Sequence, residues 1–139
     1  MIEAAVFCLA MNIYHESRNQ STEGQNMVAL VTMNRAGWDN QQVCHVVAAP
    51  HQFSWTIGKT VKTSFGYAVH NSAYPHEAVA WFRSLRIARA TIRAGKLTWN
   101  LDISKGATFY HTKYIKRPYW ARKMKVVTVV GDHIFYQRA

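Results

Sequence analysis

The first apolar pattern of the chain leads to an acidic residue. Apolar residues recur at steps of four, three and four, the spacing of one helix face: Ile2, Val6, Leu9 and Ile13. Glu16 takes the next position on this face. Burial disfavours a charged carboxylate and raises its pKa. The pattern therefore predicts either a general acid that keeps its proton near neutral pH, or a glutamate in solvent or paired with Arg18 or another base.

The size and charge of the chain narrow its class. Its 139 residues, 49% hydrophobic and 13% aromatic, predict a single domain over residues 1–139. Seventeen Lys and Arg against seven Asp and Glu give a formal charge of +10. This charge favours anionic partners, which include nucleic acid, the phosphates of teichoic acid or lipopolysaccharide, and acidic lipid surfaces.

Cysteine content and the N-terminus bear on the compartment. Cys8 and Cys44 are too few for a disulfide framework and lack the CxxC spacing, so we expect two buried free thiols and a reducing compartment. The residues after Met1 lack the basic and apolar regions of a signal peptide, and no run reaches transmembrane length. We expect release from the cytoplasm to depend on another protein.

Helices dominate the first two thirds of the chain. Thr22 and Gln25 fit a capping box for a second helix that stops near Gly37, and a third helix is expected over residues 40–48. Residues 51–74 have no sustained period and are expected to be irregular. A long helix follows from Pro75 to about Ala94. Its predicted inner face contains Ala78, Phe82, Leu85, Ala88 or Arg89, and Ile92, and its basic face contains Arg83, Arg86, Arg89 and Arg93.

The last third has the pattern of strands. The runs "ATFYH" and "KVVTVVGDHIFYQ" are rich in β-branched and aromatic residues, and Gly131-Asp132 suits a type II′ hairpin turn. We expect an α+β fold, mainly helical, with a small C-terminal antiparallel sheet.

Six motifs in register resemble one family. They are "IYHESRNQSTEGQ", "ALVTMNR", "VCHVV", "QFSW", "GATFYH" and "VGDHIFY", spread from about Leu9 to Tyr136. Together they resemble the SleB-like cell wall hydrolases, a group of spore-cortex-lytic enzymes that includes phage endolysins. The resemblance implies a lysozyme-like, mainly helical domain that cleaves the glycan strands of peptidoglycan. It also implies that Glu16 is the catalytic glutamate of the family pattern Y-x-E-A-R-G-E.

The chain departs from the family pattern at two places. Asn19-Gln20 stands where the family often has glycine and a second glutamate, so that acid is not required here. Tyr110-His111-Thr112 stands where the family often has Y-x-N, which puts the polar contact at Thr112 in question.

The scarcity of acids favours a one-carboxylate mechanism. Most glycosidases use two carboxylates, and Glu23 is the best second candidate, although its position at a helix start explains it equally well. A lytic transglycosylase needs only one, because the 6-hydroxyl of muramic acid attacks the anomeric carbon. We therefore predict a lytic transglycosylase with Glu16 as acid and base. The alternative is a hydrolytic muramidase with a water held by Glu23, Thr32 or Asn34.

Several other side chains are candidates for binding the glycan. Thr32 either faces the site or bonds back to a helix carbonyl. Gln52, Phe53, Ser54 and Trp55 offer hydrogen bonds and aromatic faces, as do Tyr110 and Trp120, although the aromatic residues also fit a core. Trp81 is expected in the core. The full set of predicted substrate-binding residues is Glu23, Thr32, Asn34, Gln52, Phe53, Ser54, Tyr110 and Trp120.

Two other function classes fit the composition less well. The seven histidines form no H-E-x-x-H motif, so a metal amidase is disfavoured and we expect neither metal nor cofactor. The arginines of the long helix and "KYIKRPYWARKMK" resemble phosphate-tracking surfaces, but no nucleic-acid-binding motif accompanies them. We interpret the charge as attraction to anionic envelope polymers or lipopolysaccharide, and expect a monomeric endolysin held in the host cytoplasm before it reaches the wall.

Overall fold

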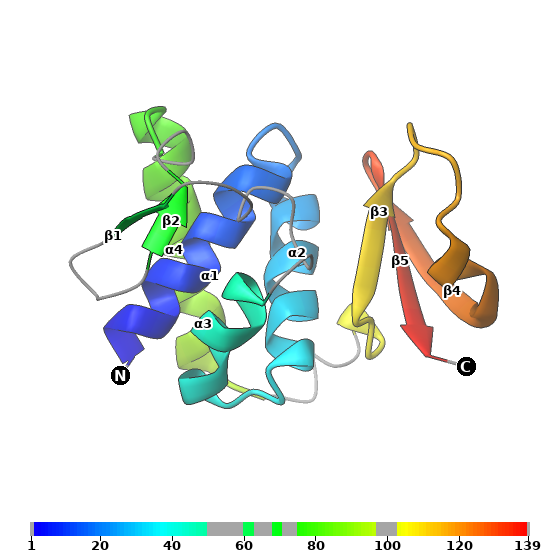
Figure 1. Ribbon diagram of the computed structural model, residues 1–139, viewed down its shortest axis with the longest axis horizontal. Helices are drawn as coiled ribbons and strands as arrows, with labels where there is room; N and C mark the ends of the chain where they lie inside the picture. Colours follow the sequence, from blue (N-terminus) through cyan, green and yellow to red (C-terminus); the bar gives the residue numbers. More distant parts are fainter. Residues whose placement is uncertain (1, 50–59, 63–67, 71–74, 97–102, 139) are drawn as a thin grey trace.

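The chain forms a helical layer and a sheet layer. The computed structural model describes residues 2–49, 60–62, 68–70, 75–96 and 103–138. Helix α2 (Thr22–Arg35) lies between the other helices and a three-stranded antiparallel sheet (Figure 1). The mainly helical α+β fold predicted from the sequence is confirmed. No helix among the described residues is both long and apolar enough to cross a membrane.

The first helix supplies much of the core. Helix α1 (Ile2–Ser17) starts where the sequence predicts, and Leu9 and Ile13 of its apolar face are fully buried. They pack in a cluster with residues of α2 and of the two helices described below.

The second helix starts at a different cap from the predicted one. Ser21 is the N-cap, and its hydroxyl accepts a hydrogen bond from the Gly24 amide at 3.2 Å. Thr22 is already helical, so the predicted cap is wrong by one residue. The Gln25 side chain instead donates to the Gln20 carbonyl at 3.0 Å. The helix ends at Arg35, and Gly37 follows it with a φ of +63°, as expected for a helix stop.

The third helix shows that the prediction of free thiols is wrong. Helix α3 (Asn40–Ala48) has the predicted bounds, with Asp39 accepting from the Gln41 amide at its N-terminus. Its Cys44 forms a disulfide with Cys8 of α1, with the two Cα atoms 5.3 Å apart. Spacing along the chain does not reveal this pair, because only the packing of α1 on α3 brings the two sulfurs together. The argument for a reducing compartment falls with it, since disulfides persist in oxidising spaces.

The long helix differs from its prediction at its first turns. Helix α4 (Ala78–Ala94) begins three residues after Pro75, and its buried residues are Ser84, Ile87, Ala88 and Ile92. The predicted inner positions Ala88 and Ile92 are confirmed, whereas Ala78 and Phe82 are exposed. The face toward α1 passes through Trp81 instead, whose ring meets that of Phe7 edge-on at 5.8 Å.

A short hairpin lies in the stretch predicted to be irregular. Strands β1 (Thr60–Lys62) and β2 (Ala68–His70) pair antiparallel, so that prediction is wrong for these residues. Three residues are too few to show the alternation that identifies a strand.

The C-terminal sheet follows the prediction. Its strands β3 (Phe109–Thr112), β4 (Met124–Val130) and β5 (His133–Arg138) are antiparallel in the order β3-β5-β4. Val130 pairs with His133 across the turn, and Gly131 has a φ of +55°, as the first position of a type II′ turn requires. The predicted hairpin is confirmed.

The two faces of the sheet have different surroundings. Phe135 is fully buried against Met27 and Val31 of α2, and Tyr110 packs against the same cluster. On the other face, Trp120 of the short helix η3 (Tyr119–Lys123) packs against Phe109, His111 and Tyr136. Successive residues of a strand point to opposite faces, so Tyr110 and its neighbours Phe109 and His111 lie on different sides.

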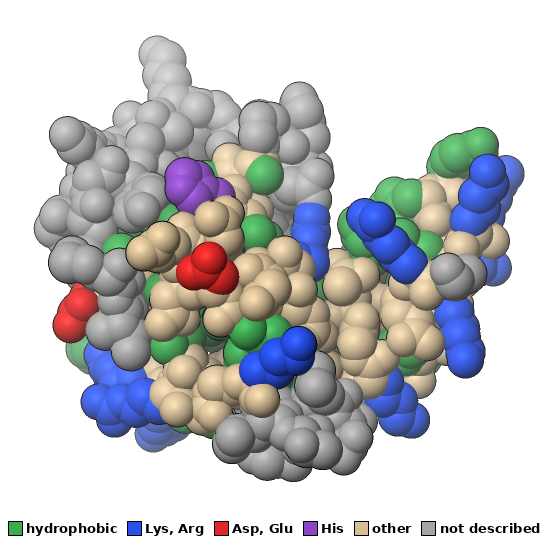
Figure 2. Space-filling view, turned by 90° about the horizontal axis from the view of Figure 1, so that it is seen from below, with side chains coloured by type: hydrophobic (Ala, Val, Ile, Leu, Met, Phe, Trp, Pro, Cys, Tyr) green, Lys and Arg blue, Asp and Glu red, His purple; other side chains and the backbone are tan. Residues whose placement is uncertain are grey.

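Basic side chains gather on the sheet layer. The part of the molecule formed by this sheet and its connections shows Lys, Arg and hydrophobic side chains, and no acidic ones, in the space-filling view (Figure 2). Between residues 113 and 131 the sequence contains six Lys and Arg and no acid.

Candidate active site

Glu16 lies where the end of α1 meets the sheet. It is the penultimate residue of the helix and is half-buried. Burial raises the pKa of Glu16 to about 7, while a hydrogen bond from Tyr110 lowers it in part. A carboxyl group in this state is protonated in about half of the molecules at neutral pH. It can therefore donate a proton and take one back in the same reaction.

Tyr110 connects this carboxyl group to the sheet. Its hydroxyl lies on the helix-facing side of β3, and burial raises the Tyr110 pKa well above its usual value, with the nearby charge of Glu16 acting in the same direction. A tyrosine so placed stays protonated across the physiological range. It acts as a hydrogen-bond donor to the Glu16 carboxylate.

Asn12 interacts with Tyr110 from one helical turn before Glu16. A hydrogen bond from Asn12 lowers the Tyr110 pKa, and the Asn12 amide also donates to the Thr32 hydroxyl at 3.1 Å. Thr32 in turn donates to the Val28 carbonyl at 2.8 Å. Asn12 and Thr32 are both fully buried. Of the two predicted alternatives for Thr32, the structure shows the hydrogen bond back to a helix carbonyl. The Thr32 hydroxyl also accepts the hydrogen bond from Asn12 and so helps to hold that side chain in place.

Asn34 holds the segment that leads into β3. Its amide nitrogen donates to the Ala107 carbonyl at 2.9 Å and to the Ser104 hydroxyl at 3.1 Å. Its oxygen accepts from the Trp38 indole at 2.9 Å. These bonds connect α2 to the segment just before β3. Asn34 therefore helps to position the strand that carries Tyr110.

A second connection between the layers uses Gln20. Its side-chain nitrogen donates to the Asp132 carboxylate at 2.9 Å, and its oxygen accepts from the Asp132 amide at 3.0 Å. A Cβ atom at Gly131 would lie 2.5 Å from the Gln20 side-chain oxygen and would displace it, and the positive φ at this turn independently favours glycine. We call this pair of hydrogen bonds the Gln20–Asp132 latch. It joins the loop after Glu16 to the hairpin of the sheet.

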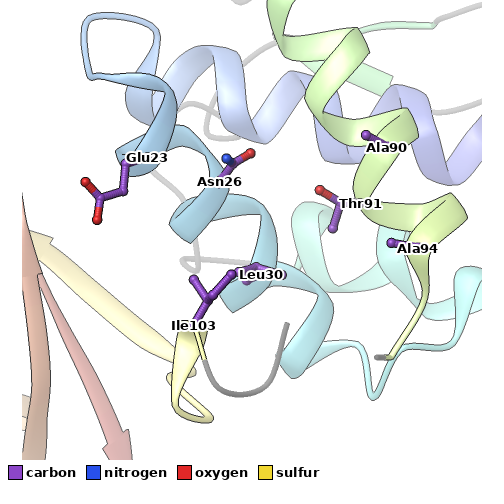
Figure 3. Close-up of a pocket in the computed structure, with 7 residues that line it drawn as sticks. All are labelled: Glu23, Asn26, Leu30, Ala90, Thr91, Ala94 and Ile103. Atoms are coloured by element: carbon purple, nitrogen blue, oxygen red, sulfur yellow. The ribbon is translucent and has the colours of Figure 1, made fainter. Parts of the chain in front are cut away.

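The predicted second acid, Glu23, lines a cavity to which Glu16 does not contribute. Glu23 is exposed on the first turn of α2 and lines a cavity of about 620 Å³ between α2 and α4 (Figure 3). The cavity is also lined by Asn26, Leu30, Ala90, Thr91, Ala94 and Ile103. Glu16 and Tyr110 are not among these lining residues, so the structure does not bring Glu23 together with the candidate acid in this cavity.

Of the remaining predicted glycan-binding residues, one lies on the other face of the sheet and four lie outside the described residues. Trp120 is on the outer face of the sheet, opposite to Tyr110, with its ring 5.5 Å from that of Tyr136. It is therefore not beside Glu16. Gln52, Phe53, Ser54 and Trp55 lie outside the described residues.

Three other acids in the described part of the chain, Glu77, Asp39 and Asp132, have structural partners. Glu77 forms an ion pair with Arg18 at 2.6 Å, and its carboxylate accepts a hydrogen bond from the Tyr14 hydroxyl at 3.5 Å. Tyr14 and Glu16 are two residues apart and so point to different sides of α1. Asp39 caps α3, and Asp132 forms the latch. No group of three or more His, Cys, Asp and Glu side chains in the described ranges is arranged to hold a metal ion.

Two features of the site were missed from the sequence. Asn12 precedes Glu16 by four residues, a spacing that places both on one helix face and was available as a signal. The Gln20–Asp132 latch had only an indirect signal, because Gln20 replaces the second glutamate of the family pattern.

Comparison with known families agrees with the motifs. A family model described as Cell Wall Hydrolase matches residues 19–136, which include Tyr110 and the latch. The match starts three residues after Glu16, so the assignment of the acid depends on the local motif and on the geometry above. No curated protein and no solved structure gives a significant match to the chain. The matched range covers most of the 139 residues, and the chain therefore belongs to the SleB-like cell wall hydrolase family, whose substrate is peptidoglycan.

Proposed function

We propose that the protein is a lytic transglycosylase that cleaves the bond between MurNAc and GlcNAc with Glu16 as its single acid and base. The observation that carries this proposal is the half-buried Glu16 carboxyl group with a pKa of about 7 and a hydrogen bond from Tyr110. One such group fits a reaction that needs a proton donor and then a proton acceptor at the same place.

The proton returns to Glu16 within the reaction. Protonated Glu16 donates to the glycosidic oxygen, and the bond between this oxygen and the anomeric carbon breaks. The resulting carboxylate accepts the proton of the muramic acid 6-hydroxyl, whose oxygen bonds to the anomeric carbon. The product ends in 1,6-anhydromuramic acid, and no water is consumed.

Tyr110 and Asn12 act at the stage of the reaction in which Glu16 is negatively charged. Glu16 is negative between the two proton transfers, and the Tyr110 hydroxyl stabilises that charge at a partly desolvated position. Asn12, held by Thr32, orients the hydroxyl. We propose a positioning role for Thr32 and Asn34. Any direct contact of the glycan with Glu23, Gln52, Phe53, Ser54 or Trp120 remains a prediction.

Mass spectrometry of the soluble products tests the proposal. Purified peptidoglycan is digested with the native protein and with Glu16→Gln. Anhydromuramic ends from the native protein alone are the expected result. Reducing muramic ends would favour the alternative muramidase, in which water attacks and a second polar group must hold it. Cleaved amide bonds, or an active Glu16→Gln protein, would refute the role of Glu16.

We also propose that the protein acts as a phage endolysin. This role requires that the chain folds in the host cytoplasm with Cys8 and Cys44 reduced and that their disulfide forms after release, since the cytoplasm keeps thiols reduced. Alkylation of thiols in expressing cells, before and after permeabilisation of the inner membrane, tests it. We expect the thiols to be reduced before the inner membrane is permeabilised. We expect lysis only after permeabilisation. Lysis of intact cells would contradict the role.

A further inference from the structure

Exposed hydrophobic side chains are concentrated in one basic segment. Nine large hydrophobic residues are exposed in the described part of the chain, and six of them lie between residues 114 and 129: Tyr114, Ile115, Tyr119, Trp120, Val126 and Val129. Solvated basic loops have no need of such residues, and exposed apolar groups gathered in one place mark interaction sites.

Cations alternate with these hydrophobic residues. Between β3 and the start of β4 the chain carries Lys113, Lys116, Arg117, Arg122 and Lys123, all exposed. We call residues 113–123 the basic–aromatic segment. The Arg122 guanidinium lies 5.6 Å from the centre of the Tyr119 ring, and the Lys113 amine lies 5.5 Å from that of Tyr114. Charge and apolar surface are thus presented together.

The segment is held in place by the sheet. Trp120 packs against Phe109, His111 and Tyr136 on the outer face, and Arg117 donates to the Ala121 carbonyl at 3.0 Å. At the other end, the Tyr114 hydroxyl donates to the Asp132 carboxylate at 3.0 Å. A partner therefore meets an ordered surface and does not have to order the segment on binding.

We propose that the basic–aromatic segment docks the protein on a phosphate-bearing anionic lipid bilayer. Its cations are drawn to anionic headgroups, and its tyrosines suit the boundary between headgroups and acyl chains, where aromatic rings with a polar end gather. Ile115 distinguishes a bilayer from single-stranded nucleic acid. It is 53% exposed, and an aliphatic side chain gains from entering an apolar phase but cannot stack on bases.

Docking of this kind would use the outer face of the sheet whose inner face carries Tyr110. Tyr110 projects from the inner face of β3, and the segment begins directly after the same strand. A protein held at the membrane by its sheet layer would keep its glycan site close to the wall that lies against that membrane. This inference goes beyond the proposed function and does not depend on it.

Vesicle binding tests the proposal. Glu16→Gln protein is mixed with vesicles of phosphatidylglycerol and phosphatidylcholine, and its partitioning is measured by sedimentation. Lys116→Gln/Arg122→Gln/Lys123→Gln removes three cations from the segment, and we expect partitioning to fall about 100-fold. Ile115→Ser/Tyr119→Ser keeps the charge and removes apolar surface, and we expect a fall of about tenfold. All five residues are solvent-facing, and circular dichroism checks that each variant is folded.

The arginines of α4 provide a matched control. Arg86→Gln/Arg89→Gln/Arg93→Gln removes the same charge from another exposed surface and should change partitioning by less than about threefold. Equal losses in this control would show that net charge alone drives binding and would overturn the proposal. Equal binding to vesicles of phosphatidylcholine alone would do the same. Tighter binding to single-stranded DNA, lost in the same segment variants, would assign the surface to nucleic acid and reject the bilayer.

Discussion

Replacing Tyr110 with phenylalanine should move the alkaline limb of activity to higher pH. The Tyr110 hydroxyl is the group that holds down the pKa of Glu16 against the effect of burial. A hydrogen bond to a charged group contributes about 1.5–3 kcal/mol, and 1.36 kcal/mol corresponds to about one pKa unit. The pKa of Glu16 in Tyr110→Phe should therefore rise further above about 7, by on the order of one unit.

The direction follows from the proposed role of Glu16 as an acid. Activity requires the protonated form at the first step, so it falls as pH increases through the pKa of Glu16. The measurement is kcat/KM on soluble glycan fragments as a function of pH for the native protein and the variant. The absolute rate of Tyr110→Phe should also be lower, because the carboxylate formed during the reaction loses its donor.

Tyr136→Phe is the matched control for this prediction. It removes the same hydroxyl group from the outer face of the sheet, where it hydrogen-bonds to His111 at 2.7 Å. Its alkaline midpoint should equal that of the native protein. An unchanged midpoint in Tyr110→Phe, or equal shifts in both variants, would refute the assignment of Tyr110 as the partner of Glu16.

Three further predictions concern stability and the contacts between layers. Glu16 keeps its proton up to about pH 7 in the folded protein but only up to about pH 4.5 in the unfolded chain. Glu16→Gln should therefore be as stable as the native protein at pH 4 and about 3 kcal/mol more stable at pH 8. Urea unfolding at the two pH values measures this difference, and a larger difference at pH 4 than at pH 8 would contradict the prediction. Reduction of the Cys8–Cys44 disulfide should lower the free energy of unfolding by about 4 kcal/mol and Tm by about 14 °C. Calorimetry measures this change, and a Tm insensitive to reductant would show that the bond contributes nothing. Gln20→Glu removes the donor of the latch and places two carboxylates against each other, so the free energy of unfolding should fall by roughly 1–3 kcal/mol and kcat/KM should fall as well. The double variant Gln20→Glu/Asp132→Asn should recover both quantities. An equal defect in the double variant would reject the latch.

Local patterns predicted the elements whose signals are local. The α1 stripe, the bounds of α3 and the Gly131-Asp132 hairpin each depend on spacing or turn chemistry within a few residues. The first turns of the α4 face were misplaced because Phe82 is as apolar as Trp81, and only the position of α1 decides which one packs against the core.

The candidate site was predictable only in part for a similar reason. Glu16 is marked by its own helix, but the contact with Tyr110 joins residues 94 positions apart, and the disulfide joins Cys8 to Cys44 across two helices. Side-chain pairs of this kind depend on the packing of layers, which no periodicity in the sequence encodes. The family resemblance pointed to the segment around Tyr110, without a reason for its chemistry.

The structure supplies that reason in the way the two layers meet. Helix α1 alone would leave Glu16 near its end in water, with an ordinary carboxylate pKa. Burial in the folded chain raises this pKa, and the sheet brings the Tyr110 hydroxyl that limits the rise. The Gln20–Asp132 latch and the Asn34 bonds hold the sheet at that distance. Loosening either connection should therefore alter the pH dependence of catalysis before it abolishes the fold, because the carboxyl group responds to the separation of the layers.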